Sequence, residues 1–361
     1  MRRIVGWHRL DRTHAGAQDG RRSYRNGIDV NRRDFIATLA ATSAGLAERA
    51  LAQKAPRVPT IGILSGFRSG LGIVGPGGKA GSSLAEAFRA LGYADGANIN
   101  FIARAAEGRI DRLAELAAEL VRLRCDVLIT NGSEAAAAAK QATASIPIVF
   151  LGPSYPVEEG LVASLARPGA NVTGFTLAQS DHVAKHLQLL RELVPTLAHV
   201  AVLWSPDNRG TTFFLRDAQV AAAALGLKTQ SIALRSAADV APAIASLRSG
   251  RPGAALVNAF PAVIESAQQI GEAASQLRVA TITSVPILAE RGLLLSYGAD
   301  PREFEPRIAH YVDRILRGAR PADLPVQQPT KLALVVNLRT ARAMGMTVSQ
   351  GLLQRADRVI E

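Results

Sequence analysis

The amino-acid sequence predicts an α/β protein with two lobes, each built on a doubly wound parallel sheet. Short apolar runs of strand length alternate with longer segments of helical periodicity, which is the order that parallel sheets need. The alternation runs twice, once from about residue 60 and again from about residue 181. A chain of 361 residues that is 48% hydrophobic and 20% charged is long and apolar enough for two such lobes.

The first lobe is expected to span residues 57–175. Its predicted strands are residues 60–65, 99–103, 127–129, 146–151 and 172–175. Its predicted helices are residues 83–91, 111–123 and 156–165, with a further helix that begins near Ser133. Leu113, Leu116 and Leu120 recur on one helical face, which is why residues 111–123 are assigned to a helix.

The second lobe is expected to span residues 176–298. Its predicted strands are residues 199–204, 228–234, 254–258, 280–283 and 293–298, and its predicted helices are residues 181–193, 211–225, 237–247 and 263–277. Pro195 and Gly226 end two of these helices. The remaining residues, about 299–361, are expected to return to the first lobe, so that the chain crosses between the lobes repeatedly and forms a hinge.

Residues 1–53 are predicted to be an N-terminal extension followed by an export signal. Arg32 and Arg33 precede a short apolar stretch, and an A-x-A cleavage site ends at Ala52. The apolar stretch is far shorter than the ~20 residues of a membrane-spanning helix. The paired arginines are similar to a twin-arginine signal, with Sec export left open. Because residues 1–29 lack a signal-peptide pattern, translation is hypothesised to begin at Val30 instead of Met1.

The net charge of +12 raises the question of a nucleic-acid partner. Much of that charge lies in the N-terminal extension, and the other basic residues are scattered along the chain. A nucleic-acid interface needs basic residues clustered on one face, so we expect a solvated basic surface and no nucleic-acid partner. The single cysteine, Cys125, excludes an internal disulfide and is expected to be a buried structural thiol.

Residues 70–75 match the G-x-G-x-x-G pattern of dinucleotide-binding loops. In those loops the pattern follows a strand directly and opens a helix, whereas here residues 66–69 intervene and Pro76 interrupts any helix. The stretch around Lys79 also lacks the first glycine and the Mg²⁺-binding hydroxyl of a P-loop. We therefore expect no cofactor, and we interpret residues 66–83 as an exposed loop that could face a ligand.

The sequence lacks the common catalytic and metal-binding patterns. His182 and His186 share a predicted helix face, but without an H-E-x-x-H pattern or a nearby carboxylate cluster we expect a solvated face and no metal. A G-x-S-x-G nucleophile elbow is also missing, since residues 152–156 lack the second glycine. The sequence therefore predicts a binding protein. An enzyme on a doubly wound fold is the less favoured alternative, because it needs a base or cofactor motif.

Polar and aromatic side chains follow many of the predicted strands, at the points where those strands end. In parallel sheets these points share one edge, where open α/β proteins bind ligands. Asn131 and Ser133 also lie at the start of a helix, whose free N–H groups favour an anionic group such as a carboxylate. The candidate ligand-binding residues are Ser65, Phe67, Asn131, Gly132, Ser133, Ser154, Tyr155, Asn208, Asn258, Phe260 and Tyr297.

Several segments together resemble the ABC-transporter substrate-binding proteins of the type that includes tryptophan- and phenylalanine-binding lipoproteins. They are residues 32–35, 126–132, 146–150, 165–174, 297–298, 311–318 and 321–337. The resemblance covers nearly all of residues 57–361. It implies a type I periplasmic-binding fold, capture of a small molecule such as an amino acid or related carboxylate between two hinged lobes, and delivery to a membrane permease with a separate ATPase. We further expect a periplasmic monomer whose signal peptide is cleaved near Ala52.

Two features depart from the family pattern. Family members commonly carry an acidic residue where this chain has Tyr155, and the glycine-rich loop at residues 66–83 is unusual. Both lie at expected ligand-facing positions, so the turn at Tyr155 is predicted to decide which ligand binds. The sequence shows no lipobox cysteine near Ala52, so a lipoprotein is not expected. A ligand sensor that signals to a membrane protein other than a permease is a second alternative.

Overall fold

The computed structural model describes residues 57–68, 73–178 and 182–361. Residues 58–361 form one compact unit. The predicted export signal and the extension before it lie outside the described residues, as do positions 70–72 of the G-x-G-x-x-G pattern. Within the described residues, no helix is both long enough and apolar enough to cross a membrane.

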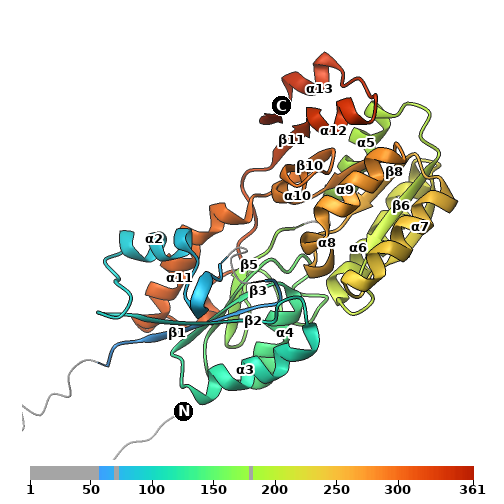
Figure 1. Cartoon of the computed structure of the whole chain (residues 1–361). Helices are drawn as coiled ribbons and strands as arrows, with labels where there is room; N and C mark the ends of the chain where they lie inside the picture. Colours follow the sequence, from blue (N-terminus) through green and yellow to red (C-terminus); the bar gives the residue numbers. More distant parts are fainter. Residues whose placement is uncertain (1–56, 69–72, 179–181) are drawn as a thin grey trace, which may run out of the picture. The chain divides into compact units, whose positions relative to one another are not determined.

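The first lobe is built on a parallel sheet with the strand order β2-β1-β3-β4-β5. Its strands are β1 (Thr60–Ser65), β2 (Asn100–Ala105), β3 (Val127–Asn131), β4 (Ile148–Leu151) and β5 (Val172–Phe175), and its connecting helices are α2 (Ser82–Ala90), α3 (Leu113–Arg122) and α4 (Ser133–Ala142) (Figure 1). Successive side chains enter opposite hydrophobic cores. Val127 and Ile129 pack in the core that includes α2, whereas Leu128 packs in the core that includes α3 and α4.

The second lobe is built on a sheet with the strand order β12-β11-β10-β9-β8-β6-β7. Its strands are β6 (His199–Trp204), β7 (Lys228–Ala233), β8 (Ala254–Val257), β9 (Ala280–Thr283), β10 (Leu295–Gly298), β11 (Ala333–Asn337) and β12 (Arg358–Ile360). Its helices are α5 (Val183–Leu193), α6 (Arg209–Ala224), α7 (Val240–Gly250), α8 (Pro261–Glu265), α9 (Ala267–Gln276), α10 (Pro286–Glu290), α12 (Leu338–Ala343) and α13 (Gln350–Gln354). Only β10 and β11 pair antiparallel within this described sheet.

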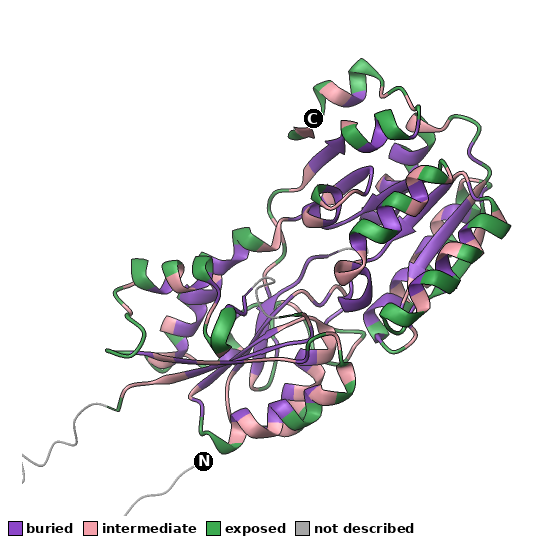
Figure 2. Ribbon diagram, in the orientation of Figure 1, coloured by how far each residue is buried: buried purple, intermediate pink, exposed green. Residues whose placement is uncertain are grey.

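Both sheets are buried between helices whose outer faces are exposed (Figure 2). This arrangement follows from the sequence, because strands covered on both faces must be apolar throughout, as the fully buried β4 and β8 are. Two doubly wound parallel sheets confirm the predicted fold class.

The chain crosses between the lobes after β5, after β10 and before β11. The middle crossing leads to α11 (Glu305–Leu316), which packs against α2 and places Ile308 and Val312 in the core of the first lobe. Segments that cross between two packed bodies are where hinge motions are absorbed. The segments expected to return to the first lobe from about residues 299–361 do not include β11 and β12, because β11 pairs with β10 at the edge of the second sheet and β12 pairs with β11.

Residues 156–165 form a series of turns and not the predicted helix. Gly160 has a φ of +72°, which a helix does not tolerate. The Lys140 ammonium donates hydrogen bonds to the carbonyl oxygens of Gly160 (2.6 Å) and Leu161 (3.2 Å), which holds this segment beside α4. The elements that sequence periodicity missed, α10, α13 and β12, are too short to show a period.

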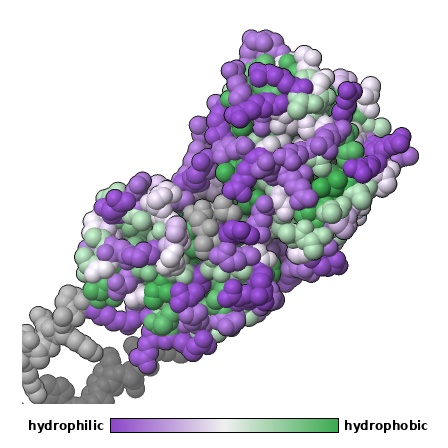
Figure 3. All heavy atoms as spheres, viewed as in Figure 1, coloured by the Kyte–Doolittle hydropathy of each residue, from purple (hydrophilic) through white to green (hydrophobic). Residues whose placement is uncertain are grey.

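Apolar and hydrophilic residues are interspersed over the face of the molecule that Figure 3 shows. Among the described residues, the exposed large apolar side chains are Leu123, Val157 and Val220. Cys125 is buried in the core beside α3, which confirms the expected structural thiol.

Candidate ligand-binding site

A cavity of about 390 Å³ is lined by residues that follow the carboxyl ends of strands in both sheets. The first lobe contributes residues at the ends of β3 and β4: Asn131, Gly132, Ser133, Glu134, Gly152 and Ser154. The second lobe contributes residues that follow β6, β8 and β9: Asn208, Gly210, Thr211, Asn258, Ala259, Phe260, Pro261, Val285 and Ile287. This volume lies in the ~300–1,000 Å³ range of small-molecule sites. The predicted position of the site, at the strand ends, agrees with this cavity.

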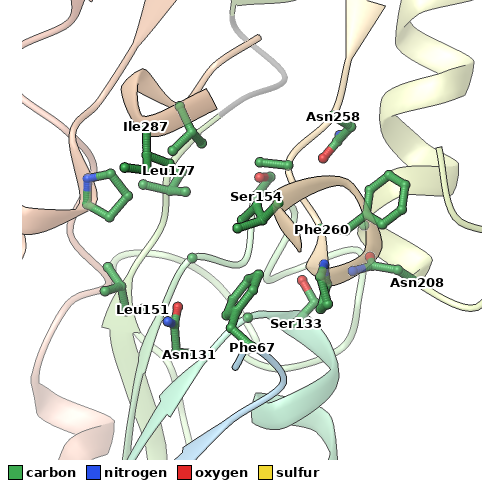
Figure 4. A pocket seen from close by; sticks show the side chains of 18 of the residues that line it. Phe67, Asn131, Ser133, Leu151, Ser154, Leu177, Asn208, Asn258, Phe260 and Ile287 are labelled. Carbon is green, nitrogen blue, oxygen red and sulfur yellow. The ribbon is translucent and has the colours of Figure 1, made fainter. Parts of the chain in front are cut away.

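Apolar side chains form much of the cavity surface. Phe67, Leu151, Leu177, Phe260 and Ile287 lie around it from both lobes (Figure 4). The Phe67 ring lies beside Gly132, 3.5 Å from where a Cβ atom on that glycine would be. An apolar or aromatic part of a ligand would be enclosed by these groups.

Three polar side chains at the cavity have hydrogen-bonding capacity to spare. Asn131, Ser154 and Asn258 line the cavity (Figure 4), and their side chains make no hydrogen bond to any other described residue. Buried or half-buried amides and hydroxyls are normally paired. These groups are therefore available to a ligand or to water.

Gly132 and Gly152 let the β3 and β4 loops approach each other beneath the cavity. Their φ angles are +95° and +111°, a region that favours glycine. A Cβ atom on Gly152 would lie 3.4 Å from the backbone nitrogen of Gly132. The close approach brings the two loops that carry Asn131 and Ser154 to the same cavity.

Glu134 links the two lobes at the edge of the cavity. Its Oε1 atom accepts a hydrogen bond of 2.7 Å from Nδ2 of Asn208, the residue that caps the N-terminus of α6. The Asn208 Oδ1 atom accepts at the same time from the Thr211 backbone N–H at 3.1 Å. Burial raises the pKa of the Glu134 carboxyl, and the bond from Asn208 opposes that rise.

A second carboxyl, that of Glu159, lies beside the first turn of α6. A Cβ atom on Gly210 would be 2.7 Å from its Oε1 atom. Burial raises the pKa of Glu159 to about 7, and the hydrogen bond from Ser133 opposes the rise. Glu134 and Glu159 place two carboxyl groups beside the start of α4, and the expectation that Asn131 and Ser133 hold a ligand carboxylate stays a prediction.

The far end of the cavity carries further charged groups. Arg302 forms a two-point ion pair with Asp300, with 2.9 Å between Nε and Oδ1. Glu305 is 3% exposed, burial raises its pKa, and its Oε2 atom has no hydrogen-bond partner among the described residues. Arg291 donates from Nη1 to the Ile264 carbonyl at 2.9 Å and has no carboxylate within ion-pair distance in the described part of the chain.

Eight of the candidate residues line the cavity. They are Phe67, Asn131, Gly132, Ser133, Ser154, Asn208, Asn258 and Phe260. Ser65 does not, because its hydroxyl is buried and accepts from the Phe67 backbone N–H at 3.1 Å.

Tyr297 lies away from the cavity and packs against the two histidines of α5. Its carbonyl accepts a hydrogen bond of 2.7 Å from His186 Nε2, and its ring meets the edges of the His182 and His186 rings. Both histidines are buried, so the expected solvated helix face is wrong. Burial lowers the pKa of His186 to about 4, so this imidazole is neutral at pH 7. The described residues contain no group of three or more potential metal ligands.

Tyr155 is also outside the cavity, although it follows Ser154 directly. It is 3% exposed, and its side chain packs on α6 of the second lobe, where its hydroxyl donates to Asp217 Oδ2 at 2.7 Å. The expectation that this side chain faces a ligand is therefore wrong, because alternate residues of an extended segment point in opposite directions.

Sequence reasoning missed Glu134, Arg291, Arg302 and Glu305 as cavity residues. Glu134 directly follows Ser133 in the turn after β3, so its position was a usable signal. Arg291 directly follows α10 in the second lobe. Arg302 and Glu305 follow β10, and they reach the cavity because the chain crosses back to the first lobe at that point. No local pattern in the sequence marks such a crossing.

Comparisons with known proteins agree with the fold. Residues 78–360 match the family described as ABC transporter substrate binding protein. A tyrosine-binding protein of Clostridioides difficile (strain R20291) is 25% identical over 270 residues, which cover 74% of this chain and 77% of that protein.

Solved structures show the same architecture. A conserved domain protein from Vibrio cholerae is 25% identical with a TM-score of 0.76, covering 84% of this chain and 100% of that one. An ABC domain in complex with L-Trp from Streptococcus pneumonia is 21% identical with a TM-score of 0.74, covering 84% and 99%.

The family match spans most of the described chain and is a match to solute-binding proteins, which confirms the prediction of a non-enzymatic, ligand-binding role. A glucose-galactose binding protein from Geobacillus stearothermophilus (TM-score 0.55) and a LacI family transcriptional regulator from Bifidobacterium animalis (TM-score 0.54) are also similar in structure, which is consistent with the type I periplasmic-binding fold. This chain belongs to the family of ABC transporter substrate-binding proteins.

Proposed function

We propose that the protein binds an amino acid with an apolar or aromatic side chain, or a closely related carboxylate, and delivers it to the permease of an ABC transporter. The observation that carries this proposal is the cavity, which combines an apolar surface with the side chains of Asn131, Ser154 and Asn258, none of which is hydrogen-bonded to another described residue. A site of this kind encloses an apolar group and fixes its orientation through a few hydrogen bonds.

The charged groups at the cavity suit a zwitterion. Asp300 and Arg302 neutralise each other, which leaves Arg291 as a cation in the second lobe and Glu134 and Glu305 as carboxyl groups in the first. An α-amino acid carries a carboxylate that suits Arg291 and an ammonium that suits a carboxyl group such as that of Glu134. The tyrosine-binding relative from C. difficile supports the same ligand class.

The N-terminal pattern supports export. An A-x-A site that ends at Ala52 and the paired Arg32 and Arg33 support a cleaved signal and a periplasmic location, with export by the twin-arginine or the Sec route. We propose that the mature protein is a monomer that acts with a permease and a separate ATPase and that has no nucleic-acid partner. Sequencing the N-terminus of the secreted protein tests the proposed cleavage, and a mature chain that still carries residues before Ala52 would contradict it.

The ligand class is tested by calorimetric titration of the purified protein with the natural amino acids, aromatic acids and simple amides. We expect saturable binding of an apolar or aromatic amino acid and weaker binding of its amide and of its deaminated analogue. A protein that binds only a sugar or a polyol, or that converts any of these compounds into a product, would overturn the proposal.

A further inference from the structure

We propose that Tyr155 and Asp217 form a latch that holds the lobes together and sets part of the ligand affinity without touching the ligand. Tyr155 follows β4 of the first lobe, and Asp217 lies in α6 of the second. The proposal extends the solute-binding function, since a latch on the lobes matters only if the cavity between them takes a ligand.

The latch is a single residue of one lobe inserted into the other. The Tyr155 hydroxyl donates to Asp217 Oδ2 at 2.7 Å, and its ring lies 5.5 Å from the Phe213 ring, centroid to centroid. Only 3% of Tyr155 is exposed, and it belongs to the hydrophobic cluster of the second lobe. Its burial and its hydrogen bond are therefore lost when the lobes separate.

Each half of the latch is organised within its own lobe. On α6, Asp217 Oδ1 accepts from Arg216 Nε at 2.9 Å, and the Arg216 guanidinium lies 5.3 Å from the centre of the Phe213 ring. In the first lobe, the Tyr155 backbone exchanges hydrogen bonds with Glu159, through its N–H to Oε1 (3.3 Å) and its carbonyl to the Glu159 N–H (2.8 Å). Because both halves are preformed, joining them orders few additional groups.

The same two segments carry the latch and the cavity. Ser154, next to Tyr155, lines the cavity, and the first turn of α6 lines it through Asn208, Gly210 and Thr211. Phe213 follows on the next turn. A ligand that contacts both segments favours the arrangement in which the latch is made, so latch and ligand stabilise the same state. When the competent state is only partly populated, the apparent dissociation constant rises in inverse proportion to that population.

The chain offers a matched control inside one lobe. Tyr93 donates from its hydroxyl to Asp313 Oδ1 at 2.8 Å, and this pair joins the region after α2 to α11 within the first lobe. Replacing Tyr93 removes the same kind of bond without touching the contact between the lobes. A change in lobe separation or ligand affinity that occurs in Tyr155→Phe and not in Tyr93→Phe is therefore caused by loss of the contact between the lobes.

The first test needs no ligand. Spin labels are attached through Arg122→Cys on α3 and Arg248→Cys on α7, since the native Cys125 is buried, and the distance distribution is measured by pulsed electron spin resonance. We expect Tyr155→Phe and Asp217→Ala to shift the distribution toward longer distances and Tyr93→Phe to leave it unchanged. Identical distributions in all four proteins would overturn the proposal, whatever the ligand is.

The second test uses L-tyrosine as the probe in calorimetric titrations. Loss of a hydrogen bond to a carboxylate is expected to weaken binding about tenfold in Tyr155→Phe and in Asp217→Ala, with no further loss in the double variant. Tyr93→Phe should bind like the wild type. Additive losses in the double variant, or an equal loss in Tyr93→Phe, would contradict a latch. If the wild-type protein binds neither L-tyrosine nor any other compound in the screen, the proposed ligand class is wrong. The distance measurement still tests whether the latch holds the lobes together.

Discussion

The Asn208 side chain acts on two lobes at once: it caps the N-terminus of α6 through Oδ1 and donates through Nδ2 to Glu134 across the cavity. A helix cap is ordinarily a local device. Here the Nδ2–H group of the same amide donates to the opposite lobe, so the integrity of α6 and the contact between the lobes depend on one side chain.

Asn208→Ala is expected to lower the free energy of unfolding by about 1 kcal/mol through the lost cap and to weaken ligand binding through the lost bond to Glu134. Asn337→Ala is the matched control, because Asn337 caps α12 in the same way but donates to Ala289 of its own lobe. Urea denaturation and calorimetric titration separate the two effects. If both variants lose stability and neither loses affinity, the bond between Asn208 and Glu134 has no part in binding.

Gly210→Ala is expected to weaken ligand binding a few-fold while leaving α6 itself intact or slightly more stable, since alanine favours a helix over glycine by about 0.5–1 kcal/mol. The added methyl would lie 2.7 Å from Glu159 Oε1, 3.1 Å from Asn208 Oδ1 and 3.3 Å from Ser133 Oγ, so the Glu159 carboxyl must move away from its partners. Gly351→Ala is the control, because a Cβ atom there meets nothing within 4 Å. Equal affinities of the two variants for the ligand would show that a methyl group at residue 210 fits between the lobes without a loss of binding.

Glu159 is expected to make stability fall as pH rises. Burial raises its pKa from 4.5 to about 7 in the folded protein, so between these values the folded state binds a proton that the unfolded state has released. The stabilisation is present below pH 4.5 and is lost through pH 7, by at most about 3 kcal/mol for this group. Glu159→Gln should flatten the profile of unfolding free energy against pH, whereas Glu158→Gln, at the exposed neighbour, should not. An unchanged slope in Glu159→Gln would disprove the assignment.

Phe67→Ala is expected to weaken binding of an aromatic amino acid at least tenfold at little cost in stability, because the half-buried ring lies at the cavity and not in the core. Phe88→Ala gives the opposite pattern. Phe88 is fully buried between the rings of Tyr93 and Phe101, so its loss should cost about 3–5 kcal/mol of stability. Thermal denaturation and titration of the two variants distinguish a ligand contact from a core residue. Equal stability losses in both would place Phe67 in the core.

The sequence was sufficient to predict the two lobes and the edge at which the cavity lies, because buried parallel strands and their polar ends leave a local signature. It did not predict which way adjacent residues of a loop point. Ser154 and Tyr155 were assigned the same role, yet one lines the cavity and the other enters the opposite lobe. Nor could it show that Arg302 and Glu305 reach the site, since that depends on where the chain crosses between lobes, which is a property of the assembled fold.

Arg291 provides the sharpest test of ligand orientation. It lines the cavity, is held by the Ile264 carbonyl, and has no carboxylate partner among the described residues, so a ligand carboxylate would complete its pairing. Wild-type protein should therefore prefer L-tyrosine over L-tyrosinamide, and Arg291→Gln should reduce that preference about tenfold or more. Arg248→Gln, on the exposed end of α7, should leave it unchanged. If Arg291→Gln weakens the binding of both compounds equally, Arg291 stabilises the fold through its bond to Ile264 and does not bind the ligand carboxylate.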